Sequence, residues 1–322
     1  MDSPAITKDS LQQLQAHSSM RSQMSLSSYL DPDSVFCFVK YFCHHACHPL
    51  YGVVNSHAKP TKILTLGDGY GLEGLILSSY FPCSDVLVTD IDTTALQRLS
   101  SARKKNTPYR ALDMYDMQSY PSADIISTKE SLHHLDRPHM AIYNMLEATN
   151  DMIIIVEPNG EACYSIGNES YEVSGNYKYQ FTHKELVQMC AAQGIYDVIL
   201  GYIPNSIYIA NAMALKTVNP KKWNNAETRP RPHELTVNPI PELLEYCKGE
   251  PNWPSKILLE VDRWSTEGRP ENFYKSFPWI IFMASKRGTL KEAFSSSGLI
   301  HTSYLRNVSL KQNPYEQSSK WH

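Results

Sequence analysis

The sequence predicts an α/β fold, a doubly wound and mostly parallel sheet of seven strands. Short apolar runs alternate with helical patterns from residue 61 to residue 202, which is typical of a parallel sheet with helices on both faces. A glycine-rich turn follows the first run, and the most apolar run, 152–156, indicates a fully buried strand. The hydrophobic share of 42% is sufficient for a core, which excludes wholesale disorder.

The expected elements follow one another in the order that such a fold needs. Helices are expected over 72–80, 93–105, 136–149 and 182–193, and the last of them ends at Gly194. The expected strands are 63–66, 85–90, 109–112, 123–128, 152–156, 197–202 and 279–284.

Two segments are expected to flank the core. The pattern of residues 1–60 predicts a helical N-terminal cap or lid, with one helix running from Val35 towards His48 and ending before Pro49. Residues 204–278 hold ten of the 20 prolines, which predicts an insertion without long regular elements that forms an acceptor wall. The other divisions are a core at 61–203, its last strand at 279–288 and a polar C-terminal tail at 289–322.

Composition limits the class of partner. Thirty Lys and Arg residues against 33 Asp and Glu give a formal charge of −3, so no basic excess exists to bind a phosphate backbone. No apolar run approaches the roughly 20 residues of a membrane helix, and the polar N-terminus lacks a signal peptide's apolar region. Seven cysteines without a framework spacing indicate reduced thiols. We therefore expect a cytoplasmic protein with a small-molecule substrate, no nucleic acid and no membrane, whose oligomeric state stays open.

The strongest motif is the glycine-rich turn 67–71, Gly-Asp-Gly-Tyr-Gly, between the first expected strand and helix. Such a turn lets a ligand approach the backbone closely and offers it amide groups. Asp90 ends the second expected strand about 20 residues later, where a carboxylate can bind a ribose diol. The pair favours nucleoside binding.

These motifs, with four further segments, make the chain resemble class I S-adenosylmethionine-dependent methyltransferases, which are Rossmann-like, over about 61–202 and 279–286. The further segments are VLVTDID, ALDMYDM, DIISTKESLHHLDRP and IIIVEPNG. A dinucleotide enzyme is disfavoured, because Leu72 stands after the GxGxG pattern and the last glycine of GxGxxG is absent.

The resemblance implies S-adenosylmethionine as the cofactor, with contacts at the ends of successive strands. For Asp113 a role in a solvated turn has equal weight, and Tyr29 is a candidate lid residue over the site. The implied contacts are Gly67, Asp68, Gly69 and Gly71 to the methionine and ribose, Asp90 to the ribose hydroxyls, Ile91, Asp113 and Met114 to the adenine, and Thr128, Lys129 and Glu130 to the methionine end.

One position departs from the family pattern. Many members carry an acid two residues before the first glycine, near the methionine ammonium, and here that residue is Thr65. A carboxylate would raise the pKa of the amine, whereas threonine cannot. Either Asp68 or Glu130 substitutes for it, or the amine is left easier to deprotonate.

Candidate catalytic residues lie after the fourth and fifth expected strands. Tyrosine rings can stabilise a sulfonium or a methylated amine through cation–π contact. Tyr177 is the first candidate, followed by Tyr164 and His134, although packing a loop is the alternative role for all of them. The aromatic residues of this loop are Tyr164, Tyr171, Tyr177, Tyr179 and Phe181.

No metal site is expected. The Cys and His residues of 43–48 form two i,i+4 pairs, each with too few ligands for a site. A buried helix with polar edges is the favoured interpretation of this run.

The sequence thus favours a small-molecule methyltransferase that acts on nitrogen or oxygen by in-line displacement. A second hypothesis keeps the cofactor and changes the reaction: a cyclase or lyase that forms azetidine-2-carboxylate and methylthioadenosine from S-adenosylmethionine alone. A third is a catalytically silent, cofactor-binding partner subunit. The methyl acceptor is not identified.

Overall fold

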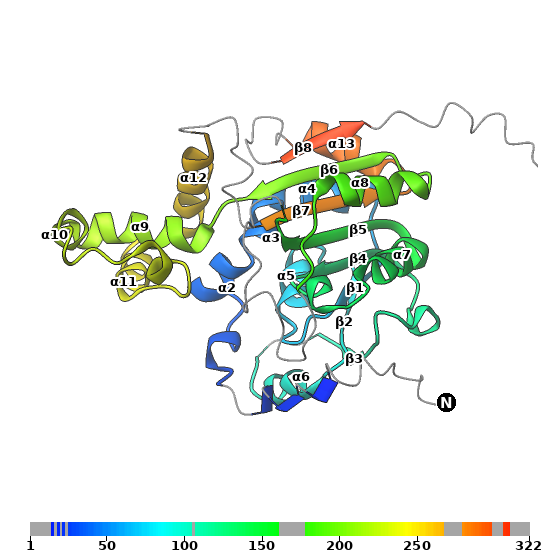
Figure 1. Ribbon diagram of the computed structural model, residues 1–322, viewed down its shortest axis with the longest axis horizontal. Helices are drawn as coiled ribbons and strands as arrows, with labels where there is room; N and C mark the ends of the chain where they lie inside the picture. The colour runs from blue at the N-terminus through cyan, green and yellow to red at the C-terminus, as the bar shows by residue number, and fades with distance from the viewer. Residues whose placement is uncertain are drawn as a thin grey trace, which may run out of the picture.

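The structure is a computed structural model that describes residues 14–15, 18–19, 21–22, 25–104, 107–160, 178–266, 279–297 and 305–309. Its centre is an eight-stranded sheet in the order β3-β2-β1-β4-β5-β7-β6-β8 (Figure 1). The strands β1 to β5 pair in parallel, whereas β7 is antiparallel to both of its neighbours and β8 is antiparallel to β6. The strands are β1 Lys62–Leu66, β2 Asp85–Asp90, β3 Tyr109–Ala111, β4 Ala123–Lys129, β5 Thr149–Pro158, β6 Asp197–Ile203, β7 Trp279–Ser285 and β8 Leu305–Ser309.

The predicted fold class is confirmed: seven strands in the order 3-2-1-4-5-7-6, with β7 inserted antiparallel, form a mostly parallel, doubly wound α/β sheet. The eighth strand comes from the segment that the sequence assigns to a polar tail. It extends the sheet beyond β6.

Helices cover both faces of the sheet. Alternate residues of β5 point to opposite faces of the sheet. Ile154 packs with α3, α4, α9 and α13 on one face, and Ile153 and Ile155 pack with α7 and α8 on the other. The α-helices are α2 Val35–Lys40, α3 Phe42–Ala46, α4 His48–His57, α5 Leu72–Tyr80, α6 Thr94–Ser100, α7 Pro138–Ala148, α8 His183–Ala192, α9 Ser206–Val218, α10 Pro220–Asn224, α11 Pro241–Gly249, α12 Trp253–Thr266 and α13 Thr289–Ser296. The 3-10 helices are η1 Ser27–Tyr29, η2 Met117–Ser119, η3 Leu132–His134 and η5 Pro232–Leu235. Among the described residues, none of these helices is long and apolar enough to cross a membrane.

Two expectations about helices are wrong. The single helix expected before Pro49 is three short helices, which break at Tyr41 and Cys47. Pro49 lies in the first turn of α4, where its missing N–H costs no helical hydrogen bond. The insertion 204–278 does contain a long element, because α9 runs for 13 residues between Pro204 and Pro220.

The insertion stands beside the carboxyl ends of the central parallel strands. Helices α10, α11 and α12 pack around α9, which also contacts α2 of the N-terminal segment (Figure 1). The two flanking segments therefore meet each other next to the sheet.

Close packing of α5 on β2 depends on a glycine. A Cβ atom on Gly74 would lie 2.4 Å from Cγ2 of the fully buried Val88. No atom lies within 4 Å of the equivalent position on Gly52 in α4, which makes Gly52 a matched control.

We expect Gly74→Ala to lower the free energy of unfolding by about 1–3 kcal/mol, because overpacking forces α5 away from β2. Gly52→Ala should be neutral or stabilising by up to about 1 kcal/mol, since alanine restricts the unfolded chain and favours the helix. Urea unfolding of both variants measures the difference. Equal stabilities of the two variants would show that α5 does not need this close approach.

Candidate functional site

The glycine turn lies at the carboxyl end of β1, where the strand order changes direction between β1 and β4. Gly67 and Gly71 have positive φ angles of 65° and 66°, which side chains other than glycine rarely adopt. The turn is also crowded: a Cβ atom on Gly67 would lie 2.4 Å from Oγ of Ser131, which donates a hydrogen bond to the Gly67 carbonyl at 2.9 Å. Ligands of open α/β sheets bind at this kind of switch point.

Asp90 ends β2 as expected, but its carboxylate is already paired. Nη1 of Arg21 donates to Oδ1 of Asp90 at 2.9 Å and to the carbonyl of Asp92 at 3.0 Å, and Nη2 lies 3.4 Å from Oδ2 of Asp90. Arg21 and Asp90 are 8% and 5% exposed, so this is a buried ion pair.

The guanidinium of Arg21 also covers the glycine turn. A Cβ atom on Gly69 would lie 2.4 Å from its central carbon, and the Tyr70 ring lies 5.5 Å from it. Arg21 therefore occupies the space that a ribose on Asp90 would need. Sequence reasoning missed this residue, although Arg21 is the one Lys or Arg within 17–31, which could have marked it.

The three expected adenine contacts lie just after the ends of β2 and β3. Met114 lies against the turn, because its Cε atom is 2.7 Å from the Cβ position of Gly67. Asp113 is 7% exposed, and its Oδ1 accepts from the Tyr115 amide at 2.9 Å, so the carboxylate closes a buried turn. Ile91 is half-buried after β2.

The acids of the turn are buried and close to each other. Oδ2 of Asp68 accepts hydrogen bonds from the Gly74 amide at 2.8 Å and from the Thr65 hydroxyl at 3.3 Å. Burial, and then the charge of Glu73, raise the pKa of Asp68 to about 7. Thr65 is thus hydrogen-bonded to the acid of the turn.

Glu73 links the turn to the N-terminal helices, a connection that the sequence did not reveal. Its Oε1 accepts from the Ser127 hydroxyl at 2.5 Å and is hydrogen-bonded to Nε2 of His44 at 3.1 Å. The other ring nitrogen of His44 is bonded to the Tyr51 hydroxyl at 2.9 Å. His44 is therefore a packed core histidine, and no group of residues with metal-ligand character occurs within the described ranges.

The three residues expected at the methionine end differ in their surroundings. Thr128 is fully buried, and its hydroxyl donates to the Leu66 carbonyl at 3.1 Å. The side chain therefore links β4 to β1 within the sheet. Glu130 has a φ of 53°, a conformation that is uncommon outside glycine, and it pairs with Lys129. Burial lowers the pKa of Lys129 to about 8.

The loop after β4 is held by Glu157. This fully buried carboxylate accepts from the amides of Ser131 and Leu132 at 2.9 and 2.8 Å and bonds Nδ1 of His133 at 2.7 Å. His134 is half-buried and its ring packs against that of His133, with centroids 4.0 Å apart and the planes tilted by 39°. Glu157 thus closes the turn that follows β4.

The candidate tyrosines divide into two groups. Tyr177, Tyr164 and Tyr171 lie outside the described residues, and their roles stay predictions. Tyr179 donates to Glu185, and its ring packs 4.9 Å from that of the fully buried Phe181. These two rings pack the loop.

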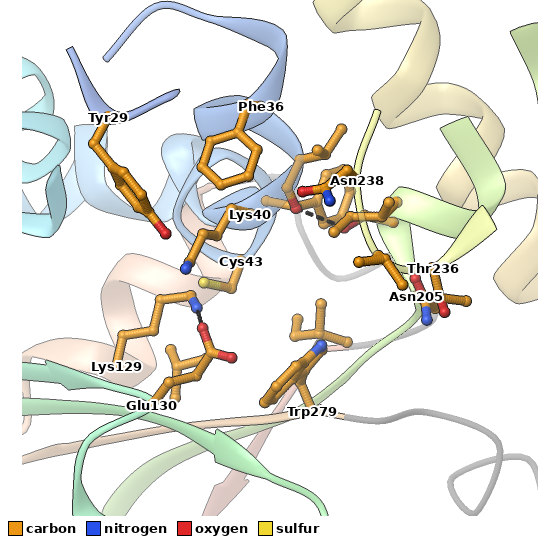
Figure 2. Close-up of a pocket in the computed structure, with 17 residues that line it drawn as sticks. Tyr29, Phe36, Lys40, Cys43, Lys129, Glu130, Asn205, Thr236, Asn238 and Trp279 are labelled. Carbon is orange, nitrogen blue, oxygen red and sulfur yellow. Dashed lines mark hydrogen bonds and ion pairs between the residues drawn. The ribbon is translucent and has the colours of Figure 1, made fainter. Parts of the chain in front are cut away.

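A cavity of about 380 Å³ lies at the carboxyl ends of β4 and β5. Helix α2, the loop 236–238 and the start of β7 form its other walls, so both flanking segments contribute to it. Lys40, Lys129 and Glu130 supply its charged groups, and Tyr29 and Trp279 stand on two sides (Figure 2). Cavities of this size suit small organic ligands.

No family model matches the chain, and no curated protein matches it. Among solved structures, it is similar to phosphoethanolamine N-methyltransferase 2 of Haemonchus contortus in complex with S-adenosyl-L-methionine, at 15% identity and a TM-score of 0.44 over 70% of this chain and 48% of that chain. This chain thus spans about half the length of that enzyme.

Two further solved structures match this chain over a larger share of their own length. The plantazolicin methyltransferase BpumL, with a triazolic desmethylPZN analog and SAH, is 14% identical with a TM-score of 0.46 over 87% of this chain and 98% of that chain. A putative sarcosine dimethylglycine methyltransferase from Galdieria sulphuraria is 11% identical with a TM-score of 0.44 over 78% and 84%. At such identities and TM-scores these likenesses carry no conclusion about the activity of this chain.

We expect Arg21→Met to tighten the binding of S-adenosylhomocysteine by about tenfold or more, because a charge-assisted hydrogen bond of about 1.5–3 kcal/mol no longer competes for Asp90. The same variant should lose about 3 kcal/mol of stability, since the buried carboxylates of Asp90 and Asp92, which lie 2.9 and 3.7 Å from Nη1 of Arg21, lose their cation. Arg21→Lys keeps the charge but loses the two-pronged hydrogen bonding of the guanidinium. Its affinity and its stability should therefore lie between those of Arg21→Met and the wild type. Calorimetry and urea unfolding measure both effects, and weaker binding by Arg21→Met would make Arg21 part of the ligand site.

Proposed function

We propose that this chain binds S-adenosylmethionine at the carboxyl edge of its sheet and transfers the methyl group to a nitrogen or oxygen of a small-molecule acceptor. The observation that carries the proposal is the convergence of three features at the switch point of the sheet. These are the glycine turn after β1, the carboxylate at the end of β2, and the cavity at the ends of β4 and β5.

The space over Gly69 fits the ribose of this cofactor. The guanidinium of Arg21 now fills it and donates to both oxygens of Asp90. A ribose diol is also a pair of donors on adjacent atoms, so it can replace the guanidinium on the same carboxylate. The site therefore fits once Arg21 withdraws.

S-adenosylmethionine, when bound, supplies an electrophilic methyl group on its sulfonium. The chain's own contribution is to hold an acceptor in the neighbouring cavity, in line with that methyl group and away from bulk water. Lys129 is buried at the edge of this cavity with a pKa of about 8, so the neutral minority form of its amine is the one that takes a proton from an acceptor. Tyr29 and Trp279 present ring faces to the same space.

A cyclase that uses S-adenosylmethionine alone is the second candidate, and one observation favours it. That reaction needs a neutral substrate amine, and the residue at the family's acidic position is the buried Thr65. Asp68, its hydrogen-bond partner, has a pKa raised to about 7, so it is a weaker counter-ion for an ammonium than an ordinary carboxylate.

Product analysis separates these functions. We expect S-adenosylhomocysteine to form only when a metabolite extract is added, as measured by mass spectrometry of the adenosyl products. Methylthioadenosine formed without the extract, at a rate that rises between pH 7 and pH 9 as the substrate amine deprotonates, would contradict methyl transfer and support the cyclase. Neither product, with the cofactor bound, would indicate a silent partner subunit.

Asp90→Ala should weaken the binding of S-adenosylhomocysteine by about tenfold or more, because ribose hydrogen bonds to a charged group contribute on the order of 1.5–3 kcal/mol. Asp85→Ala is the matched control, because Asp85 begins the same strand and is exposed. Calorimetry in which both variants bind like the wild type would remove the ribose assignment.

A further inference from the structure

The cavity beside the proposed cofactor site carries more positive than negative charge. Two lysine amines enter it from different walls, Lys40 from α2 and Lys129 from the end of β4, and they point towards one another (Figure 2). Glu130 is the one carboxylate among the described residues that line the cavity, and it pairs with Lys129.

Lys40 lacks such a partner. No carboxylate within the described part of the chain lies within ion-pair distance of its amine. Its nitrogen instead lies 5.3 Å from the centre of the Tyr29 ring and 5.8 Å from the centres of the Phe36 and Tyr70 rings.

The environment of Lys40 is energetically unfavourable for a cation. Burial lowers the pKa of its amine, and the pKa of Lys129 is lowered by burial and by the charge of Lys40. Cation–π contact with these ring faces stabilises the ammonium by about 0.5–2 kcal/mol. This is less than a charge-assisted hydrogen bond to a carboxylate provides when it is shielded from water. Among the described residues, the Lys40 amine therefore has no directly paired carboxylate, and Asp68 of the glycine turn acts on it only through its charge.

We propose that Lys40 is the counter-ion of a carboxylate bound in this cavity. A ligand with one carboxylate on an apolar or aromatic body would match both the single amine without a directly paired carboxylate and the walls of Phe36, Val39 and Trp279. A phosphate dianion would overcompensate the charge.

The carboxylate has two possible sources, and this part of the inference rests on the proposed function. One is the methionine carboxylate of the cofactor, which would reach from the glycine turn to Lys40. The turn is close, because the charge of Asp68 acts on the Lys40 amine. The other source is the carboxylate of a separate acceptor.

The test variant is Lys40→Met, which removes the charge and keeps the apolar stem. Its control is Lys62→Met, because Lys62 is exposed at the start of β1. The probes are S-adenosylhomocysteine, methylthioadenosine, which lacks the carboxylate, and benzoate with benzamide as its neutral analogue. If the cofactor is the source, Lys40→Met weakens S-adenosylhomocysteine binding about tenfold or more and leaves methylthioadenosine unchanged. If an acceptor is the source, only benzoate binding to the S-adenosylhomocysteine-bound protein is lost.

Lys40→Arg should restore the lost binding in either case, because it keeps the charge. Lys40→Met should also unfold at a urea concentration equal to or above that of the wild type, since a partly buried cation without a directly paired carboxylate is removed. Unchanged affinity of Lys40→Met for every probe overturns the proposal, as does equal loss of benzoate and benzamide. If the wild type binds no adenosyl ligand, the proposed function fails, and benzoate binding by the free protein still tests Lys40.

Discussion

The buried carboxylate of Asp90 is the constraint on which the arrangement of the site depends. A carboxylate that is 5% exposed needs a cation or several donors, and Arg21 provides both. The same contact brings the N-terminal segment to the sheet, where Arg103 donates from Nε to the Tyr29 carbonyl at 2.9 Å. Helix α2, which carries Lys40 on the cavity wall, follows this segment and is held by its own packing on the core and on α9.

The carboxyl edge of the sheet concentrates ionisable groups that elsewhere in a protein would lie in water. Asp68, Glu73 and Lys129 are all held there with little exposure, and two of them have pKa values moved towards neutrality. Such groups reduce the stability of a fold, and they gather where a ligand or a proton must be handled. At the opposite edge of the sheet, Asp124 accepts from the Thr61 amide at 2.8 Å, and the buried Asp151 accepts from the Ser285 hydroxyl at 2.6 Å.

Periodicity and turn chemistry were sufficient to predict seven of the eight strands, the glycine turn and the place of Asp90, because these depend on residues close in sequence, whereas β8 lies in the segment expected to be a polar tail. The partners of the same residues could not be predicted, since Arg21 and Asp90 are 69 positions apart and His133 and Glu157 are 24 apart. Composition was also misleading for α9, because prolines limit helices only where they stand, and here they stand at its ends.

The central claim is that a nucleoside replaces Arg21 on Asp90. Hydrogen–deuterium exchange with and without S-adenosylhomocysteine tests it most directly, because it reports each segment separately. We expect slower exchange in peptides over 65–72 and 88–92, where the ligand binds, and faster exchange in 18–30, which loses its anchor. Unchanged exchange over 65–72 and 88–92, or protection of 18–30 together with them, would contradict the claim.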